Sequence, residues 1–167
     1  GAESRGGVES SSYFEWGGRN ADGTPGFAEH RPGWAMPIHE LLVKHHVSAV
    51  FHGHDHLYVN SQRDGLVYQC VPQPGNPRGN TRTATQYGYE SGTIYGSPGH
   101  LRVRVDADRA TVEFVRTAMA GAVGNEHGNQ NRRGNGGVGG EANAAVVHSY
   151  TIEPAAAAAM AKPDSHR

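Results

Sequence analysis

The residues best suited to chemistry lie in the run His54-Asp55-His56, which follows the short apolar segment 47–51. In extended backbone, residues i and i+2 point to the same side, about 6–7 Å apart along the chain. Two imidazoles so placed can each reach one of two metal ions lying about 3.5–4 Å apart. We therefore predict that His54 and His56 are metal ligands.

The neighbours of this pair have different expected roles. Asp55 has the opposite parity, so we expect it to face away and to support the turn. His52 shares the parity of the pair and either packs in the strand or points into the same cleft. Gly53 is expected to let the chain turn sharply and to admit metal ions close to the backbone.

Two alternatives to a dinuclear site stay open. The histidines of this run could be surface-turn residues or core residues that bond to backbone groups. A mononuclear zinc site built from His52, His54 and His56 would also suit the spacing. Seven further histidines lack ligand spacing and are assigned to no metal: His39, His45, His46, His100, His127, His148 and His166.

The elements around this run can be read from apolar periodicity. A helix is predicted from Trp34 to His46, with Pro37 in its first turn, where a missing N–H costs nothing. Its expected buried stripe comprises Ile38, Leu41, Leu42 and His45. Segment 47–51 is typical of a buried strand, which puts the histidine run at the carboxyl end of a strand, where α/β sheets form clefts.

Mostly antiparallel strands are expected after this point. Strands are predicted near 57–59 and over 65–71, joined by a turn at Arg63-Asp64-Gly65. A hairpin follows, in which Leu101, Val103 and Val105 form an inward face, residues 106–109 turn, and Val112, Phe114 and Arg116 continue the alternation. Another strand is predicted at 146–152, whereas residues 1–33 and 72–98 resemble loops.

Composition limits the domain organisation and the partners. Of 167 residues, 36% are hydrophobic, 24 are glycine and 9 are proline, so much of the chain must be loop. We expect one domain over 1–152, with a flexible Gly/Asn-rich insertion at 118–144 and a disordered tail at 153–167. The net charge of −1 supplies no basic face for nucleic acid, and no segment approaches the roughly 20 apolar residues of a membrane span. The single cysteine, Cys70, is expected to be buried in the core.

Several motifs together resemble one family of hydrolases. The run 53–56 after an apolar strand is similar to Gly-His-x-His, the last metal-binding motif of calcineurin-like metallophosphoesterases, the superfamily that includes purple acid phosphatases. Further segments resemble a bacterial branch of that superfamily: Arg5-Gly6-Gly7, Trp16-Gly17-Gly18, 30–34, 71–74 and 99–103. Metallo-β-lactamase-type hydrolases and amidohydrolase barrels also use paired histidines, but their surrounding patterns fit less well.

The resemblance implies the C-terminal part of a four-layer αββα sandwich with two divalent or trivalent metal ions, such as Fe, Zn or Mn. It implies that His54 ligates one ion and His56 the other, and that a hydroxide activated by both ions hydrolyses a phosphate ester. The family's earlier motifs, including Asp-x-His and Gly-Asp-x-x-Asp, are not found before Gly53, so we expect the segment alone to be inactive. Bacterial proteins of this kind often look secreted, which favours a secreted or periplasmic location.

Substrate contacts are expected in the loop before the helix. Arg31 is the substrate-binding candidate, because a guanidinium suits phosphate. Trp16, Asn20 and His30 could also shape binding, although structural anchoring is the favoured role for each. The runner-up function is a non-catalytic structural or interaction module that keeps the same sheet.

Overall fold

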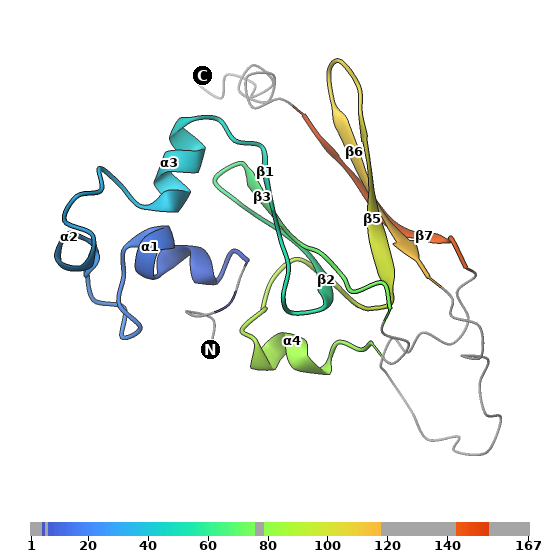
Figure 1. Ribbon diagram of the computed structural model, residues 1–167, viewed down its shortest axis with the longest axis horizontal. Coiled ribbons are helices and arrows are strands. Elements are labelled where there is room, and N and C mark those ends of the chain that lie inside the picture. Colours follow the sequence, from blue (N-terminus) through green and yellow to red (C-terminus); the bar gives the residue numbers. More distant parts are fainter. Residues whose placement is uncertain (1–4, 6, 76–78, 118–142, 154–167) are drawn as a thin grey trace, which may run out of the picture.

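The computed structural model describes residues 5, 7–75, 79–117 and 143–153 as a mixed α/β fold with many strands and a few short helices (Figure 1). Residues 118–142 of the insertion expected at 118–144 and residues 154–167 of the tail expected at 153–167 lie outside the described residues. The helices are the 3₁₀ turn η2 (Ser10–Ser12), α1 (Phe14–Gly17), α2 (Phe27–His30), α3 (Ile38–Lys44) and α4 (Arg82–Gln86). The strands are β1 (Ala49–His52), β2 (Leu57–Arg63), β3 (Leu66–Cys70), β4 (Thr93–Gly96), β5 (Gly99–Val105), β6 (Ala110–Arg116) and β7 (Val146–Ile152).

Within the described residues, the first sheet has four strands in the order β1-β3-β2-β4. β2 and β3 form the predicted hairpin, whose two-residue turn places Asp64 at φ 51° and Gly65 at φ 80°. These left-handed values suit the tight turn that matches the twist of paired strands. β3 lies between β1 and β2 and runs parallel to β1. The connection 53–56 must therefore cross the carboxyl end of β3.

Each face of the first sheet packs against a different layer. Tyr68 of β3 faces the helices, where its ring lies 6.0 Å from that of Trp16 in α1. Tyr58 of β2 faces the other way and stacks on Phe114 of β6, with 4.6 Å between ring centroids. Figure 1 accordingly shows α1–α3 on one side of β1–β4 and the strands β5–β7 on the other.

The second sheet among the described residues has the order β5-β6-β7, which confirms the predicted hairpin and the strand at 146–152. Val112 and Phe114 are fully buried, as the alternation predicts. The inward role predicted for Val103 and Val105 is wrong, because they are 45% and 77% exposed. Val105 pairs with Ala110 next to the turn of the hairpin, and the hairpin tip extends past the first sheet in Figure 1, so the first sheet does not cover this end of the second sheet.

The helix before the site differs from its prediction in start and in buried face. It begins at Ile38 because Pro37 disfavours helical backbone in the residue before it, and Pro37 itself is extended, with ψ 157°. The predicted apolar stripe is wrong, since Leu41 is 43% exposed and His45 is also exposed. His39 is the buried residue of α3. It packs there because its Nδ1 lies 2.7 Å from the Tyr68 hydroxyl and its Nε2 lies 2.9 Å from Asp64 Oδ2.

β1 is an edge strand rather than a buried one. Phe51 is 46% exposed, and among the described residues β1 pairs only with β3. The two regions predicted as loops also contain short elements, namely η2, α1 and α2 in the first and α4 and β4 in the second. β4 is a strand because it pairs with β2, which is distant in the sequence. The four residues of β4 alone do not predict this pairing. No helix of the described residues has the length and hydropathy to cross a lipid bilayer.

Candidate metal-ligating turn and the adjoining pocket

The connection 53–56 has a sharply bent backbone in place of the expected extended one. His54 has φ 86° and His56 has φ 57°, in the left-handed region that residues other than glycine rarely adopt. The bend attributed to Gly53 is therefore made by the histidines, since Gly53 has no positive φ. A Cβ added at Gly53 would meet no other atom within 4 Å. The prediction that extended backbone points the imidazoles of His54 and His56 to the same side is thus wrong.

The side chains of the turn nevertheless alternate in burial: Asp55 is buried, whereas His54 and His56 on either side of it are exposed. The Asp55 carboxylate accepts hydrogen bonds from Arg5 Nη1 at 2.9 Å and from the Tyr89 hydroxyl at 2.7 Å. Burial is the main cause that raises the pKa of Tyr89, so its O–H stays protonated and donates. The Arg5 guanidinium also lies 4.0 Å from the ring centroid of Tyr87, just after α4. The contacts of Arg5 and Tyr89 hold the Asp55 carboxylate on the buried side of the turn. This is the supporting role predicted for Asp55.

Cys70, the last residue of β3, lies beneath this anchor. It is fully buried, which confirms the prediction of a core cysteine, and burial raises the pKa of its thiol. It belongs to the core cluster that contains Leu57, Val59 and Tyr89. The turn that carries His54 and His56 therefore rests on packed core.

His54 and His56 themselves are exposed, and neither imidazole has a hydrogen-bond partner within the described residues. Their nitrogens suit Zn²⁺, Mn²⁺ or Fe ions, so the donor chemistry fits the expected metals. Among residues 5, 7–75, 79–117 and 143–153, however, no group of three potential ligands comes together. A His52–His54–His56 site is therefore not assembled, and a dinuclear centre would need ligands beyond the described part of the chain.

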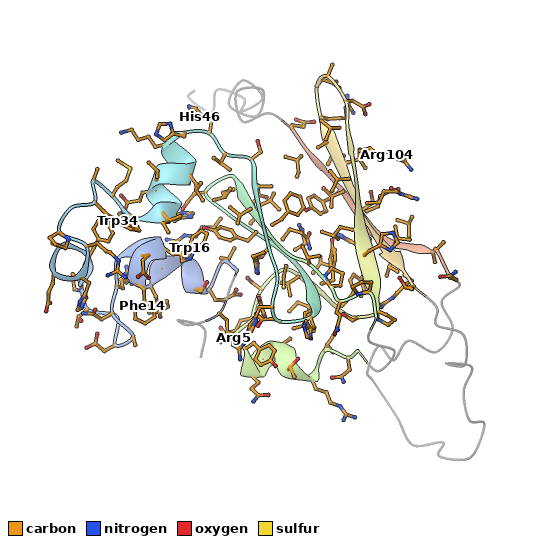
Figure 2. All side chains as sticks on the ribbon, in the orientation of Figure 1. Arg5, Phe14, Trp16, Trp34, His46 and Arg104 are labelled. Atoms are coloured by element: carbon orange, nitrogen blue, oxygen red, sulfur yellow. The ribbon has the colours of Figure 1, made fainter. Side chains whose placement is uncertain are left out.

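His52 lies apart from the exposed pair, on the face of β1 that looks toward the helices. It pairs in register with Cys70, and its two ring nitrogens are buried without a hydrogen-bond partner in the described structure. Burial lowers the pKa of His52, and the charge of Asp55 opposes this in part. His52 lines a pocket of about 300 Å³ together with Arg5, Gly7, Ser10, Trp16, Val50, Gly53 and Tyr68. Figure 2 shows Trp16 on α1 and Arg5 near α4.

Arg31, the predicted substrate contact, lines a different cavity of about 270 Å³ that includes Phe14, Arg19, Phe27 and His30. Its guanidinium pairs with Glu15 and donates to the backbone oxygen of His30. Asn20 bonds to the Thr24 hydroxyl at 3.0 Å in the same region. Of the four loop residues considered in the sequence, Trp16 is the one that lines the pocket beside Gly53.

The sequence did not predict that Arg5 and Tyr89 belong to the site. They lie 50 and 34 residues from Asp55, so no spacing rule connects them with it. The sequence did indicate that Asp55 faces away from the two histidines. A carboxylate buried in this way requires hydrogen-bond donors from elsewhere in the fold.

Comparison of the chain with models of known protein families, with curated proteins and with solved structures finds no match in any of the three.

Proposed function

We propose that this chain contributes His54 and His56 to a dinuclear metal site that hydrolyses phosphate esters. One observation carries the proposal: two exposed histidines with strained backbone flank a carboxylate anchored by Arg5 and Tyr89. Left-handed backbone at such residues costs about 1–2 kcal/mol each, and strain of this kind is concentrated at functional sites. The anchored Asp55 offsets that cost and holds both histidines toward solvent.

The roles of this chain's residues follow from that arrangement. His54 and His56 would each offer one imidazole nitrogen to an ion, and Asp55 would hold the turn between them. When bound, two such ions would acidify a water and offset negative charge on a phosphoryl group. The remaining ligands would come from residues outside the described part, since two imidazoles cannot neutralise and hold two ions.

The wider architecture proposed is the αββα sandwich of calcineurin-like metallophosphoesterases. Three of its layers have counterparts here: helices, the first sheet and the second sheet. The open edge of β1 and the exposed Phe51 support a larger sheet, because an apolar edge strand is normally covered. Exposed Val103 and Val105 support the same extension of the second sheet.

Metal binding tests the proposal directly. Mn²⁺ and Zn²⁺ binding to the 167-residue chain would be measured by calorimetry, beside the H54A, H56A and H45A variants. We expect binding that weakens about tenfold or more in H54A and in H56A, the loss that follows removal of one ligand. His45 is also exposed but lies at the end of α3, so H45A should bind as the parent chain does. Equal binding by all four proteins would remove the basis of the proposal.

Catalysis is tested separately with p-nitrophenyl phosphate and either metal. We expect no turnover by the 167-residue chain alone, because the described residues hold too few ligands. Robust turnover would instead mean that residues outside the described part complete the centre within this chain. Turnover that survives H54A together with H56A would contradict the assigned roles.

The non-catalytic module is the second candidate, and the lack of a third ligand among the described residues favours it. It predicts that H54A and H56A leave metal affinity unchanged. The same calorimetry therefore distinguishes the two functions.

A further inference from the structure

The pocket beside Gly53 combines features that the proposed metal site does not use. Both ring nitrogens of His52 are buried and without a partner among the described residues, although a buried polar group is normally hydrogen-bonded. Leaving such a group unsatisfied costs about 1–3 kcal/mol. The ring lines a pocket of about 300 Å³, which is large enough for a small ligand group.

The other polar groups of the pocket favour a ligand rich in hydrogen-bond acceptors. Arg5 lines it, and of the five N–H donors of its guanidinium one is directed at Asp55. Ser10 donates its hydroxyl proton to the Gly7 carbonyl at 3.1 Å, so it supplies no donor to the pocket. Two carboxylates lie close to this pocket. Asp55 is paired with Arg5 and Tyr89. Glu9 accepts from the Ser91 backbone N–H through Oε1, but its buried Oε2, close to Gly7, has no partner among the described residues. The donors that the pocket offers are therefore the Arg5 guanidinium and the His52 imidazole, and the Glu9 carboxylate is the nearby group that would oppose an anion.

The walls limit the size of the occupant. Trp16 and Tyr68 lie with 6.0 Å between ring centroids, and Val50 adds an apolar side chain from β1. The Tyr68 hydroxyl is already engaged with His39 Nδ1 at 2.7 Å. An oxyanion with a short organic group fits this combination of apolar walls and clustered donors.

We propose that this pocket is an oxyanion-binding site in which His52 and Arg5 donate hydrogen bonds to a phosphoryl or carboxylate group. The site is separate from the imidazoles of His54 and His56 and needs no metal ion. Where the proposed phosphoesterase function also holds, the pocket lies beside the metal-ligating turn and would receive a second anionic group of the substrate. That last step rests on the proposed function, whereas anion binding itself does not.

Trp16 provides a built-in reporter for the test. The chain has two tryptophans, and Trp34 is 49% exposed and lines no part of this pocket. W34F therefore leaves Trp16 as the single fluorophore and keeps an aromatic ring against Phe27, the ring that Trp34 contacts. Inorganic phosphate and acetate would be titrated into W34F in EDTA, with ionic strength held constant by sodium chloride.

We expect a saturable change in Trp16 fluorescence with at least one of the two anions. In W34F/H52L the dissociation constant should rise about tenfold or more, the effect of losing one hydrogen bond to a charged group. W34F/H52Q keeps a donor and an acceptor and should retain much of the affinity. W34F/H45L, the same substitution at an exposed histidine, should bind as W34F does.

Histidine side-chain ¹⁵N spectra of W34F, recorded during the same titration, give a readout that does not depend on how the leucine variant folds. One histidine should shift with anion concentration, and its signal should be missing from W34F/H52Q. The proposal is overturned if no saturable response occurs, if the response follows total salt alone, or if W34F/H52L binds as tightly as W34F. A chain with H54A and H56A that still binds the anion would separate this site from the proposed metal function.

Discussion

At the scale of single residues, Asp55 decides how the histidine turn is held. His54 and His56 adopt positive φ on either side of it, and neither imidazole makes a hydrogen bond or an ion pair within the described residues. The compensation for this strained backbone lies in the buried carboxylate, which connects the turn to Arg5 and to Tyr89. A residue that touches no substrate can in this way control the residues that would bind metal.

We predict that D55N lowers the free energy of unfolding by about 2 kcal/mol, because it removes the charged acceptor of two hydrogen bonds. Urea denaturation would measure this change. D106N is the matched control, since Asp106 is exposed in the turn between β5 and β6, and it should change stability by less than about 0.5 kcal/mol. Equal effects of the two substitutions would show that the Asp55 anchor contributes nothing.

At the scale of elements, two turns at the ends of β2 differ in where their unusual backbone falls. The turn from β2 to β3 places Asp64 and Gly65 in left-handed backbone. The connection from β1 to β2 instead places histidines there and gives Gly53 an ordinary φ. The β2–β3 turn thus uses glycine, which adopts left-handed backbone at least cost, at one of its two such positions, whereas the candidate site uses glycine at neither.

This difference predicts opposite outcomes for two glycine-to-alanine substitutions. G65A should lower the free energy of unfolding by about 1–2 kcal/mol, because an added Cβ disfavours left-handed backbone even with no atom nearby. G53A should leave stability unchanged or raise it by up to about 1 kcal/mol, because its Cβ meets open space. Thermal and urea unfolding of both variants would check this, and a destabilised G53A would contradict the described turn.

At the scale of the whole molecule, a partly buried polar contact joins the two sheets. The Tyr58 hydroxyl of β2 donates to His148 Nδ1 of β7 at 2.6 Å. Burial raises the pKa of Tyr58, which therefore stays a donor, and lowers the pKa of His148 from its ordinary 6.5. Tyr150 of β7 packs beside the same imidazole, and burial raises its pKa to about 12. The lowered pKa favours the neutral form of His148 at neutral pH.

The lowered pKa of His148 makes part of the stability depend on pH. Well above pH 6.5 the imidazole is neutral in both folded and unfolded chains, so its contribution is fully present. Below 6.5 the unfolded chain gains a proton that the folded chain resists, so this contribution falls as pH drops toward the lowered folded pKa. Unfolding midpoints between about pH 7.5 and 5 would measure the loss.

H148N is expected to reduce that loss, because an asparagine oxygen can accept from Tyr58 without titrating. H100N changes a histidine on the exposed surface of β5 and should leave the pH dependence as it is in the parent chain. Identical pH profiles for H148N and the parent chain would assign the acid sensitivity to other groups.

The local pattern of the sequence was sufficient for the elements whose partners are adjacent in the chain. The alternation in 99–116 and the turn chemistry at Asp64-Gly65 predicted both hairpins, because neighbouring strands pair through local contacts. The histidine run also lies at the carboxyl end of β1, as its position after an apolar segment predicted. The roles of His54 and His56 as ligands and of Arg31 in substrate binding stay predictions.

Tertiary structure decided what depends on distant partners. His39, and not the apolar stripe of its helix, is buried because Tyr68 and Asp64 lie across from it. Phe51 and Val105 are exposed because no described element covers the edge of β1 or the hairpin tip. The histidine turn is bent because Arg5 and Tyr89 hold Asp55 inward. Periodicity reports how a segment presents its side chains, but burial and strain are set by whatever the rest of the fold places against it.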